Sequence, residues 1–398
     1  MIEVNRSGVR GEPLSSHYAS MLGLEGAAKV SAYLAHCPGS APTPTISLPD
    51  LARTLGIARL DVKDEGGRLG LGSFKALGGA YAVIQLVLER AGRQLDENLG
   101  PEAVGRHDVR AIAANMTVVC ATDGNHGRSV AAGAKMVGCK AVIYLHSGVS
   151  EERAAAIARY GAETVRVPGN YDDSVATTWD IAQQRGWTIV SDTSWPGYHE
   201  IPLTVMQGYT CMVAEVLDDL DKAPTHVFVQ AGVGGLAAAV AAHLHLRLAQ
   251  SSQPRIIVVE PDRAACLLAS LKAGRPVKVA HEQSTVMAML ECFEPSLVAW
   301  DILSRTAHAF MTVGEDDAIE AMRRLAFPLG LDPAIVAGES GGVGLAGLLR
   351  ACSTDRELLK LDEDARVLIF NTEGATDPNL YRKLVGREPQ KSTEVIAL

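Results

Sequence analysis

Short apolar runs rich in β-branched residues alternate with longer stretches of helical pattern from about residue 110 to the end of the chain. The runs are apolar at consecutive positions, which is typical of parallel strands buried on both faces. The expected strands are 117–121, 141–145, 164–167, 188–191, 226–230, 256–260 and 367–370. The expected helices are 130–136, 151–160, 173–184, 201–220 and one that begins at Leu236. This alternation predicts an α/β fold with helices on both faces of its sheets.

In such folds, ligands bind in the loops that follow the carboxyl ends of the strands. One such loop lies between strand 226–230 and the next helix, and it consists of Gly232, Val233, Gly234, Gly235 and Leu236. Glycines let the backbone approach an anion closely, and a helix N-terminus offers free amides, so the loop predicts a phosphate site. With Ala237 and Glu260 it also fits the dinucleotide pattern, so this loop alone leaves an NAD site as an equal alternative.

A second loop ends in a lysine that opens another apolar helical stretch. It reads Gly72-Ser73-Phe74-Lys75. A lone lysine at such a position is usually a solvated surface group. Lysine amines also form Schiff bases with carbonyl groups, so Lys75 becomes a chemical candidate once the neighbouring loops are considered.

A third loop joins strand 117–121 to the following helix. It reads Thr122-Asp123-Gly124-Asn125-His126-Gly127. Its polar side chains and helix-end amides are suited to holding a carboxylate. Thr and Asp are also common helix N-caps, so the loop by itself is equally consistent with a capped turn.

The order of these three loops resembles the β-family (fold type II) of pyridoxal-phosphate (PLP) enzymes, which includes serine and threonine dehydratases, cysteine synthase and threonine synthase. The resemblance extends from about residue 43 to 376. A dinucleotide site would leave the lysine and asparagine loops unexplained. The resemblance implies two open, twisted, mostly parallel sheets with helices on both faces. It also implies a large cofactor-binding domain (1–88 and 203–398) and a small substrate-loop domain (89–202).

Within this family, four segments are most similar to the diaminopropionate ammonia-lyases. Asp123 stands where the dehydratases usually carry serine, and Asp192 opens the sequence Asp192-Thr193-Ser194-Trp195. The other two segments are 206–209, which reads MQGY, and 371–377, which reads NTEGATD. The resemblance implies a carbon–nitrogen lyase that converts 2,3-diaminopropionate to pyruvate and two ammonia molecules by α,β-elimination. A serine or threonine dehydratase is the alternative, and a non-catalytic PLP carrier is a more distant one.

The same resemblance implies roles for the residues that hold the cofactor. Lys75 is expected to form the Schiff base, Phe74 to pack on the pyridine ring and Asn125 to bind the phenolic oxygen. Thr372 occupies the position that contacts the ring nitrogen in relatives. The backbone amides expected to hold the phosphate are those of Gly232, Val233, Gly234, Gly235 and Leu236.

The substrate carboxylate is expected on the third loop, at Thr122, Gly124, Asn125 and His126. Asp123 and Asp192 are expected to pair with the β-ammonium group of the substrate and to supply a proton to the leaving amine. Lys75 can reach only one face of the planar adduct. If Asp123 faces the other side, both the L and D isomers of diaminopropionate are substrates.

Composition narrows the partners further. The net charge is -9 without a clustered Lys/Arg run, so nucleic acid and anionic membranes are unlikely partners. The seven cysteines show no CxxC spacing, and no cluster of ligands suggests a metal. The first residues contain no apolar signal-peptide core, so a cytoplasmic location is expected. A homodimer is an expectation from the family alone.

Overall fold

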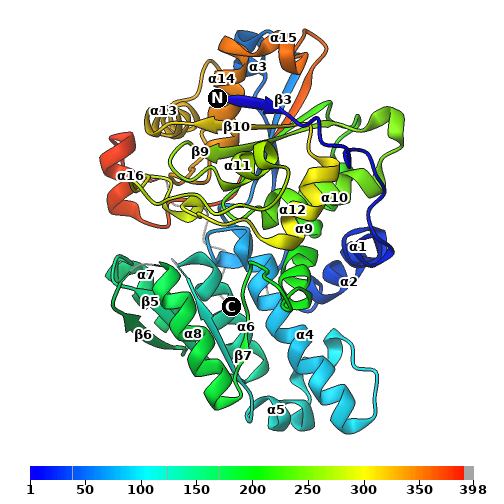
Figure 1. Ribbon diagram of the computed structural model, residues 1–398, viewed down its shortest axis with the longest axis vertical. Helices are drawn as coiled ribbons and strands as arrows, with labels where there is room; N and C mark the ends of the chain where they lie inside the picture. Colours follow the sequence, from blue (N-terminus) through cyan, green and yellow to red (C-terminus); the bar gives the residue numbers. More distant parts are fainter. Residues whose placement is uncertain (38, 123, 170, 390–398) are drawn as a thin grey trace.

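The computed structural model describes residues 1–37, 39–122, 124–169 and 171–389. It contains two sheets, the larger in the upper half of Figure 1 and the smaller in the lower half. The larger has the strand order β1-β10-β9-β8-β11-β3-β2, and the smaller has the order β6-β5-β4-β7. The strands are β1 (Ile2–Val4), β2 (Thr45–Ser47), β3 (Arg59–Asp64), β4 (Thr117–Ala121), β5 (Lys140–His146), β6 (Glu163–Val167), β7 (Thr188–Ile189), β8 (His226–Gln230), β9 (Arg255–Pro261), β10 (Ala309–Val313) and β11 (Arg366–Asn371).

Helices cover both faces of the larger sheet and connect it to the smaller one. They are α1 (Ser16–Leu22), α2 (Leu24–Leu34), α3 (Pro49–Leu55), α4 (Lys75–Leu95), α5 (His107–Ala113), α6 (Asn125–Val137), α7 (Glu151–Ala158), α8 (Tyr171–Arg185), α9 (Glu200–Asp219), α10 (Gly235–Arg247), α11 (Cys266–Ala273), α12 (Leu297–Thr306), α13 (Glu315–Ala326), α14 (Val343–Thr354), α15 (Arg356–Leu359) and α16 (Pro378–Val385). Within the described ranges, none of them is long and apolar enough to cross a membrane.

The unbroken apolar runs are explained by burial on both faces of the sheet. In β9, Ile256 and Val258 belong to the core that contains α10, whereas Ile257 and Val259 belong to the core under α14. Successive side chains of a strand point to opposite faces, so a strand between two helical layers must be apolar at every position. The predicted α/β fold with two mostly parallel sheets is therefore confirmed.

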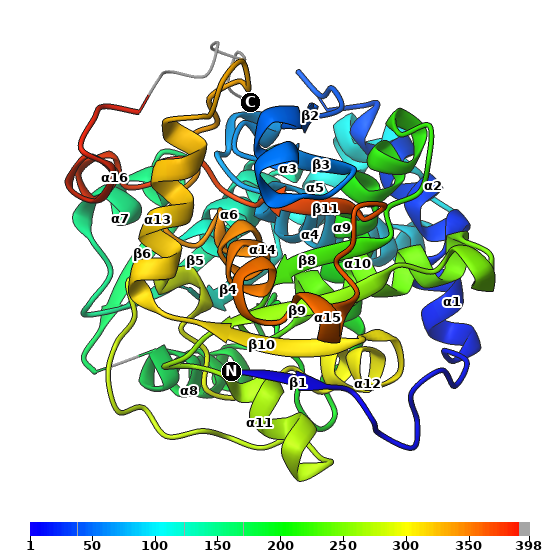
Figure 2. The same cartoon turned by 90° about the horizontal axis from the view of Figure 1, so that it is seen from above.

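The edges of the larger sheet depart from the parallel arrangement. Strand β1 pairs antiparallel with β10, and β2 pairs antiparallel with β3. Figure 2 shows β1 and β2 at opposite sides of the sheet. An edge strand has only one neighbour, so it can run in either direction without a crossover helix.

The apolar pattern did not predict β3, because this internal strand carries charged residues. Lys63 is fully buried, and its ammonium group lies 2.6 Å from the carboxylate of Glu215 on α9. It also donates a hydrogen bond to the carbonyl of Thr43. These partners compensate the cost of burying the ammonium group, and because they are distant in sequence only the tertiary structure brings them to Lys63.

Helix α4 links the two halves of the molecule. It begins at Lys75 beside the larger sheet and packs against α6 of the smaller one and α9 of the larger one. Figure 1 shows it running from the middle of the molecule toward its lower end. The expected boundary at residue 88 falls inside this continuous helix.

Candidate active site

The predicted loops meet in one pocket between the two sheets. Thr122 follows β4, Ala231 follows β8 and Thr372 follows β11, so the pocket collects the carboxyl ends of parallel strands from both sheets. The predicted residues that line it are Phe74, Lys75, Thr122, Asn125, His126, Asp192, Gly232, Val233, Gly234, Gly235, Leu236 and Thr372. Gly124 lies in the third loop but does not line the pocket, and Asp123 lies outside the described residues.

The start of α4 places Lys75 in the wall of the pocket. The amide of Phe74 donates a hydrogen bond of 3.0 Å to the carbonyl of Thr372, which ties the lysine loop to the end of β11. The Lys75 ammonium group forms an ion pair with the carboxylate of Asp192. Burial alone would lower the pKa of Lys75, but the Asp192 carboxylate outweighs this effect and raises it.

Asp192 sits between Lys75 and His126. Burial opposes ionisation of Asp192, but Lys75 and His126 lower the pKa of its carboxyl group below the usual value. The Nε2 atom of His126 donates a hydrogen bond of 2.8 Å to the carbonyl of Val190. Burial lowers the pKa of His126 and keeps the ring neutral, so Nδ1 carries a lone pair. This Nδ1 lies 3.9 Å from an Asp192 oxygen and has no hydrogen-bond partner among the described residues.

The glycine loop has the geometry of an anion cradle. Helix α10 begins at Gly235, so the amides of the loop and the first turn have no acceptor within the helix. Gly234 has a φ of +100°, which a residue with a side chain rarely adopts. A Cβ atom on Gly232 would lie 2.8 Å from the sulfur of Cys292. The loop therefore fits the phosphate group of PLP through backbone amides.

Thr372 and Asn125 are oriented by neighbours that the sequence alone did not indicate. The Nε2 atom of Gln230 donates a hydrogen bond of 2.9 Å to the Thr372 hydroxyl oxygen, so the hydroxyl proton remains available for a ring nitrogen. The Nδ2 atom of Asn125 donates a hydrogen bond of 2.6 Å to Glu373, and Arg128 donates one of 2.9 Å to the Asn125 oxygen. Asn125 thus keeps one N–H for a phenolic oxygen.

The sequence did not predict a role in the site for two further residues of this region. Tyr209 lines the pocket, and its ring lies 4.7 Å from that of Phe74 between centroids. Glu373 is 2 % exposed, and burial raises the pKa of its carboxyl group. Both lie in segments with a family resemblance, and Glu373 directly follows Thr372. That adjacency was the available signal.

An ion pair links the smaller sheet to the larger one beside the pocket. Arg153 on α7 lies 2.9 Å from Glu339, which follows β10 and α13 in the chain. Glu339 is 2 % exposed, and burial together with nearby Glu373 raises its pKa to about 7. Arg153 also lies against the third loop, since a Cβ atom on Gly124 would be 3.4 Å from its Cδ. The ion pair therefore fixes the third loop relative to the segment that contains Glu339.

Comparison with known proteins agrees with this geometry. The profile of the family described as "Pyridoxal-phosphate dependent enzyme" matches residues 37–373. A diaminopropionate ammonia-lyase of Escherichia coli (strain K12) is 42% identical over 356 residues, which cover 87% of this chain and 88% of that protein. The diaminopropionate ammonia-lyase of Salmonella typhimurium is 38% identical over 371 residues, covering 90% of this chain and 91% of its own length.

A solved structure extends the similarity to nearly the whole chain. The crystal structure of the E. coli diaminopropionate ammonia-lyase in complex with D-serine matches with a TM-score of 0.88 and 39% sequence identity. The match covers 97% of this chain and 96% of that one. This relative therefore shares the fold over nearly the whole length of the chain. The chain belongs to the pyridoxal-phosphate dependent enzymes and, among them, to the diaminopropionate ammonia-lyase family.

Proposed function

We propose that this protein catalyses the α,β-elimination of 2,3-diaminopropionate, in both its L and D forms, to pyruvate and two ammonia molecules. The contact between Asp192 and Lys75 inside the cofactor pocket carries this proposal. Diaminopropionate has a second ammonium group that serine lacks. The ionised Asp192 carboxylate beside the reacting centre stabilises that cation, which departs as ammonia without an added proton, whereas a hydroxyl leaving group has no charge for it to pair with.

Different residues of the pocket are suited to binding different parts of the cofactor. When bound, PLP supplies the electron sink that makes cleavage at the α-carbon possible. Lys75 anchors it and moves the α-proton, while the amides of the glycine loop bind its phosphate. The Thr372 hydroxyl donates to the ring nitrogen. Since a hydroxyl is a much weaker acid than a carboxylic acid, it leaves that nitrogen largely unprotonated, which favours elimination over transamination.

The third loop is suited to the substrate carboxylate. The Thr122 hydroxyl oxygen accepts hydrogen bonds from the amides of Gly124 (3.0 Å) and Gly127 (3.1 Å). These bonds shape the loop and leave the hydroxyl proton available as a donor. Helix α6 begins at Asn125, so the amides of its first turn add a positive end to the same site. His126 contributes its Nδ1 lone pair toward a substrate ammonium group.

Acceptance of the D isomer is proposed through Asp123, on the basis of the sequence. Lys75 can remove a proton from one face only, and a second base is needed for the opposite face. The crystal structure of the E. coli relative in complex with D-serine supports access of a D-amino acid to such a pocket.

Pyruvate release by the purified holoenzyme tests the proposal, with L- and D-diaminopropionate and L-serine at equal concentrations. We expect rapid turnover of both diaminopropionate isomers and little turnover of serine. Asp192→Asn should lower kcat/KM for both isomers by about 10²-fold or more, and Asp123→Asn should affect the D isomer more than the L isomer.

The outcomes separate the alternatives. A preference for serine would assign the protein to the dehydratases and remove the role of Asp192 in pairing with the leaving group. Equal losses for the two isomers in Asp123→Asn would contradict the second-base role. An absorbance change on adding diaminopropionate without product would indicate a carrier. The exposed Asp316→Asn variant, whose position does not line the pocket, controls for loss of one carboxylate.

We also propose the organisation that the family resemblance implies. It comprises a large domain of residues 1–88 and 203–398, a small domain of 89–202, a homodimer and a cytoplasmic location. The position of β4, β5, β6 and β7 within 117–189 supports the domain division. Light scattering after size exclusion measures the oligomeric state, and a mass of about one chain would exclude the dimer.

A further inference from the structure

A second large cavity lies at the opposite end of the larger sheet. This cleft has a volume of about 1440 Å³, and it is lined at the amino ends of β8, β9 and β11 by His226, Arg255 and Arg366. The PLP pocket lies beyond the carboxyl ends of β8 and β11. Strands of this length span roughly 16–23 Å at about 3.3 Å per residue, so the two sites are separate.

The cleft collects positive charge in a protein whose net charge is -9. Its lining includes seven Lys or Arg residues and two Asp residues. The cations are Arg6, Arg10, Lys222, Arg255, Arg305, Lys360 and Arg366. Arg305 is paired with Glu12 and Asp301. In the part of the chain that the structure describes, Arg10, Arg255 and Lys360 have no carboxylate within ion-pair distance.

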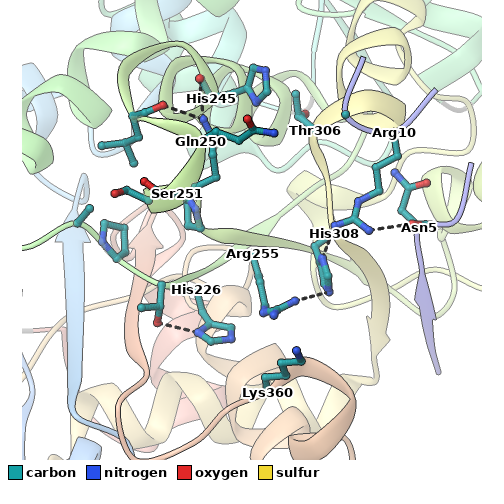
Figure 3. A pocket seen from close by; sticks show the side chains of 18 of the residues that line it. Asn5, Arg10, His226, His245, Gln250, Ser251, Arg255, Thr306, His308 and Lys360 are labelled. Carbon is teal, nitrogen blue, oxygen red and sulfur yellow. Dashed lines mark hydrogen bonds between the residues drawn. The ribbon is translucent and has the colours of Figure 1, made fainter. Parts of the chain in front are cut away.

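A row of three side chains in the cleft, Arg10, His308 and Arg255, has more hydrogen-bond donors than acceptors. The Nη2 atom of Arg10 lies 2.6 Å from Nδ1 of His308, and the Nη1 atom of Arg255 lies 3.1 Å from Nε2 of the same ring. A guanidinium group only donates, and a neutral imidazole accepts at one nitrogen only. If Nδ1 accepts from Arg10, the Nε2 proton faces the protons of Arg255. Figure 3 shows the row, with Lys360 facing the same space.

The charges around His308 agree with this geometry. Burial, then Arg10, Arg255, His226 and Lys360, lower the pKa of His308 to about 4, so its ring is neutral near pH 7. Burial and Arg255 likewise lower the pKa of Arg10. An anion placed beside the row would accept the unpaired protons and offset the repulsion between the cations.

We propose that this cleft binds a small phosphorylated molecule, with a phosphate group seated on Arg10, His308, Arg255 and Lys360. Guanidinium groups match phosphate oxygens with paired hydrogen bonds, and the lysine adds a point charge. The volume exceeds what one phosphate needs, and small-molecule sites usually measure about 300–1,000 Å³. Gln250, Ser251 and Thr306 line the remainder of the cleft and offer hydrogen bonds to the rest of the ligand. This site is independent of the proposed lyase activity.

Titration calorimetry with inorganic pyrophosphate tests the site on the PLP-loaded holoenzyme, in which the cofactor phosphate already fills the glycine loop. We expect saturable binding of one pyrophosphate per chain. Arg10→Gln and Arg255→Gln should each weaken it about tenfold or more, since each removes charge-assisted hydrogen bonds. Lys360→Gln provides a third variant on the cleft surface if one of the arginine variants folds poorly.

The matched control is Arg93→Gln, which removes the same charge from the exposed end of α4. Binding that Arg93→Gln weakens as much as Arg255→Gln would reflect net charge only and would overturn the proposal. Absence of heat at millimolar pyrophosphate would overturn it as well. So would binding that all three cleft variants leave unchanged. Turnover of diaminopropionate by each variant, expected within twofold of wild type, confirms that the holoenzyme is intact.

Discussion

The two ends of the larger sheet differ in whether their cationic side chains have carboxylate partners. At the carboxyl end, Lys75 in the PLP pocket pairs with Asp192, and Arg153 beside the third loop pairs with Glu339. The phosphate site there is built from backbone amides of a glycine loop. At the amino end, Arg10, Arg255 and Lys360 surround His308, with no carboxylate in ion-pair distance in the described ranges.

This difference follows from the cost of burial. Most residues that line the PLP pocket are buried, so an unpaired cation there would lose much of its hydration without compensation, and oriented amides attract an anion at lower cost. The cleft is open to solvent, so water and salt screen its cations while no ligand is bound. One end is therefore organised to hold a permanent cofactor, and the other is suited to an exchangeable anion. Substitutions of Lys75, Gly234 and His308 test the two ends of the sheet separately.

The largest effect is expected from Lys75→Ala. Loss of the amine that anchors the cofactor and moves the α-proton should lower turnover by at least about 10³-fold. Pyrophosphate binding at the amino end should stay unchanged, because Lys75 lies at the other end of the sheet. Pyruvate assays and calorimetry on the same preparation measure both. Lys29→Ala on the exposed face of α2 is the control, and residual activity above a tenth of wild type would contradict the assignment of Lys75.

An intermediate effect is expected from Gly234→Ala. An alanine there must adopt a φ of +100°, and its methyl group would lie 3.1 Å from Cβ of Ala299. Strain of about 1–2 kcal/mol in the loop corresponds to roughly tenfold weaker PLP binding. Gly186→Ala is the matched control, because Gly186 has a φ of +64° with nothing within 4 Å of a Cβ. Equal losses of PLP affinity in both variants would show that the loop has no special role.

The smallest effect concerns the pH dependence contributed by His308. Its folded pKa of about 4 lies below the ordinary value of 6.5, so the unfolded chain binds more protons between these values. The contribution of neutral His308 to the free energy of unfolding is therefore fully present above pH 6.5, and it is lost as the pH falls toward 4. After allowance for solvent screening, the loss by pH 5 is about 1 kcal/mol.

Denaturant unfolding at pH 7 and pH 5, in chloride buffer without phosphate, measures this contribution. His308→Gln should lose less stability on acidification than wild type does. His107→Gln, at an exposed position, should behave like wild type. A wild-type slope in His308→Gln would mean that the row of Arg10, His308 and Arg255 does not set the proton affinity of this ring.

The local sequence was informative wherever one short segment carries its own function. The apolar runs predicted β4 and β8 with their bounds, because a strand buried on both faces must be apolar throughout. The lysine loop and the glycine loop could be recognised because their geometry depends on a few consecutive residues. Helix α6 begins at Asn125 rather than at residue 130, since Thr122 accepts two amides of the loop and extends the helix toward the pocket.

Features that depend on distant partners were decided only by the tertiary structure. The sequence by itself determined the α/β class, the PLP family and the loops that form the pocket. The pairing of Lys75 with Asp192 and the support of Asn125 by Glu373 required segments more than 100 residues apart to meet. Arg10 and Arg255 likewise reach His308 from segments 298 and 53 residues away in the sequence. Backbone preferences and hydrophobic periodicity act over a few residues, whereas the energy of a charge depends on every group that the fold places around it.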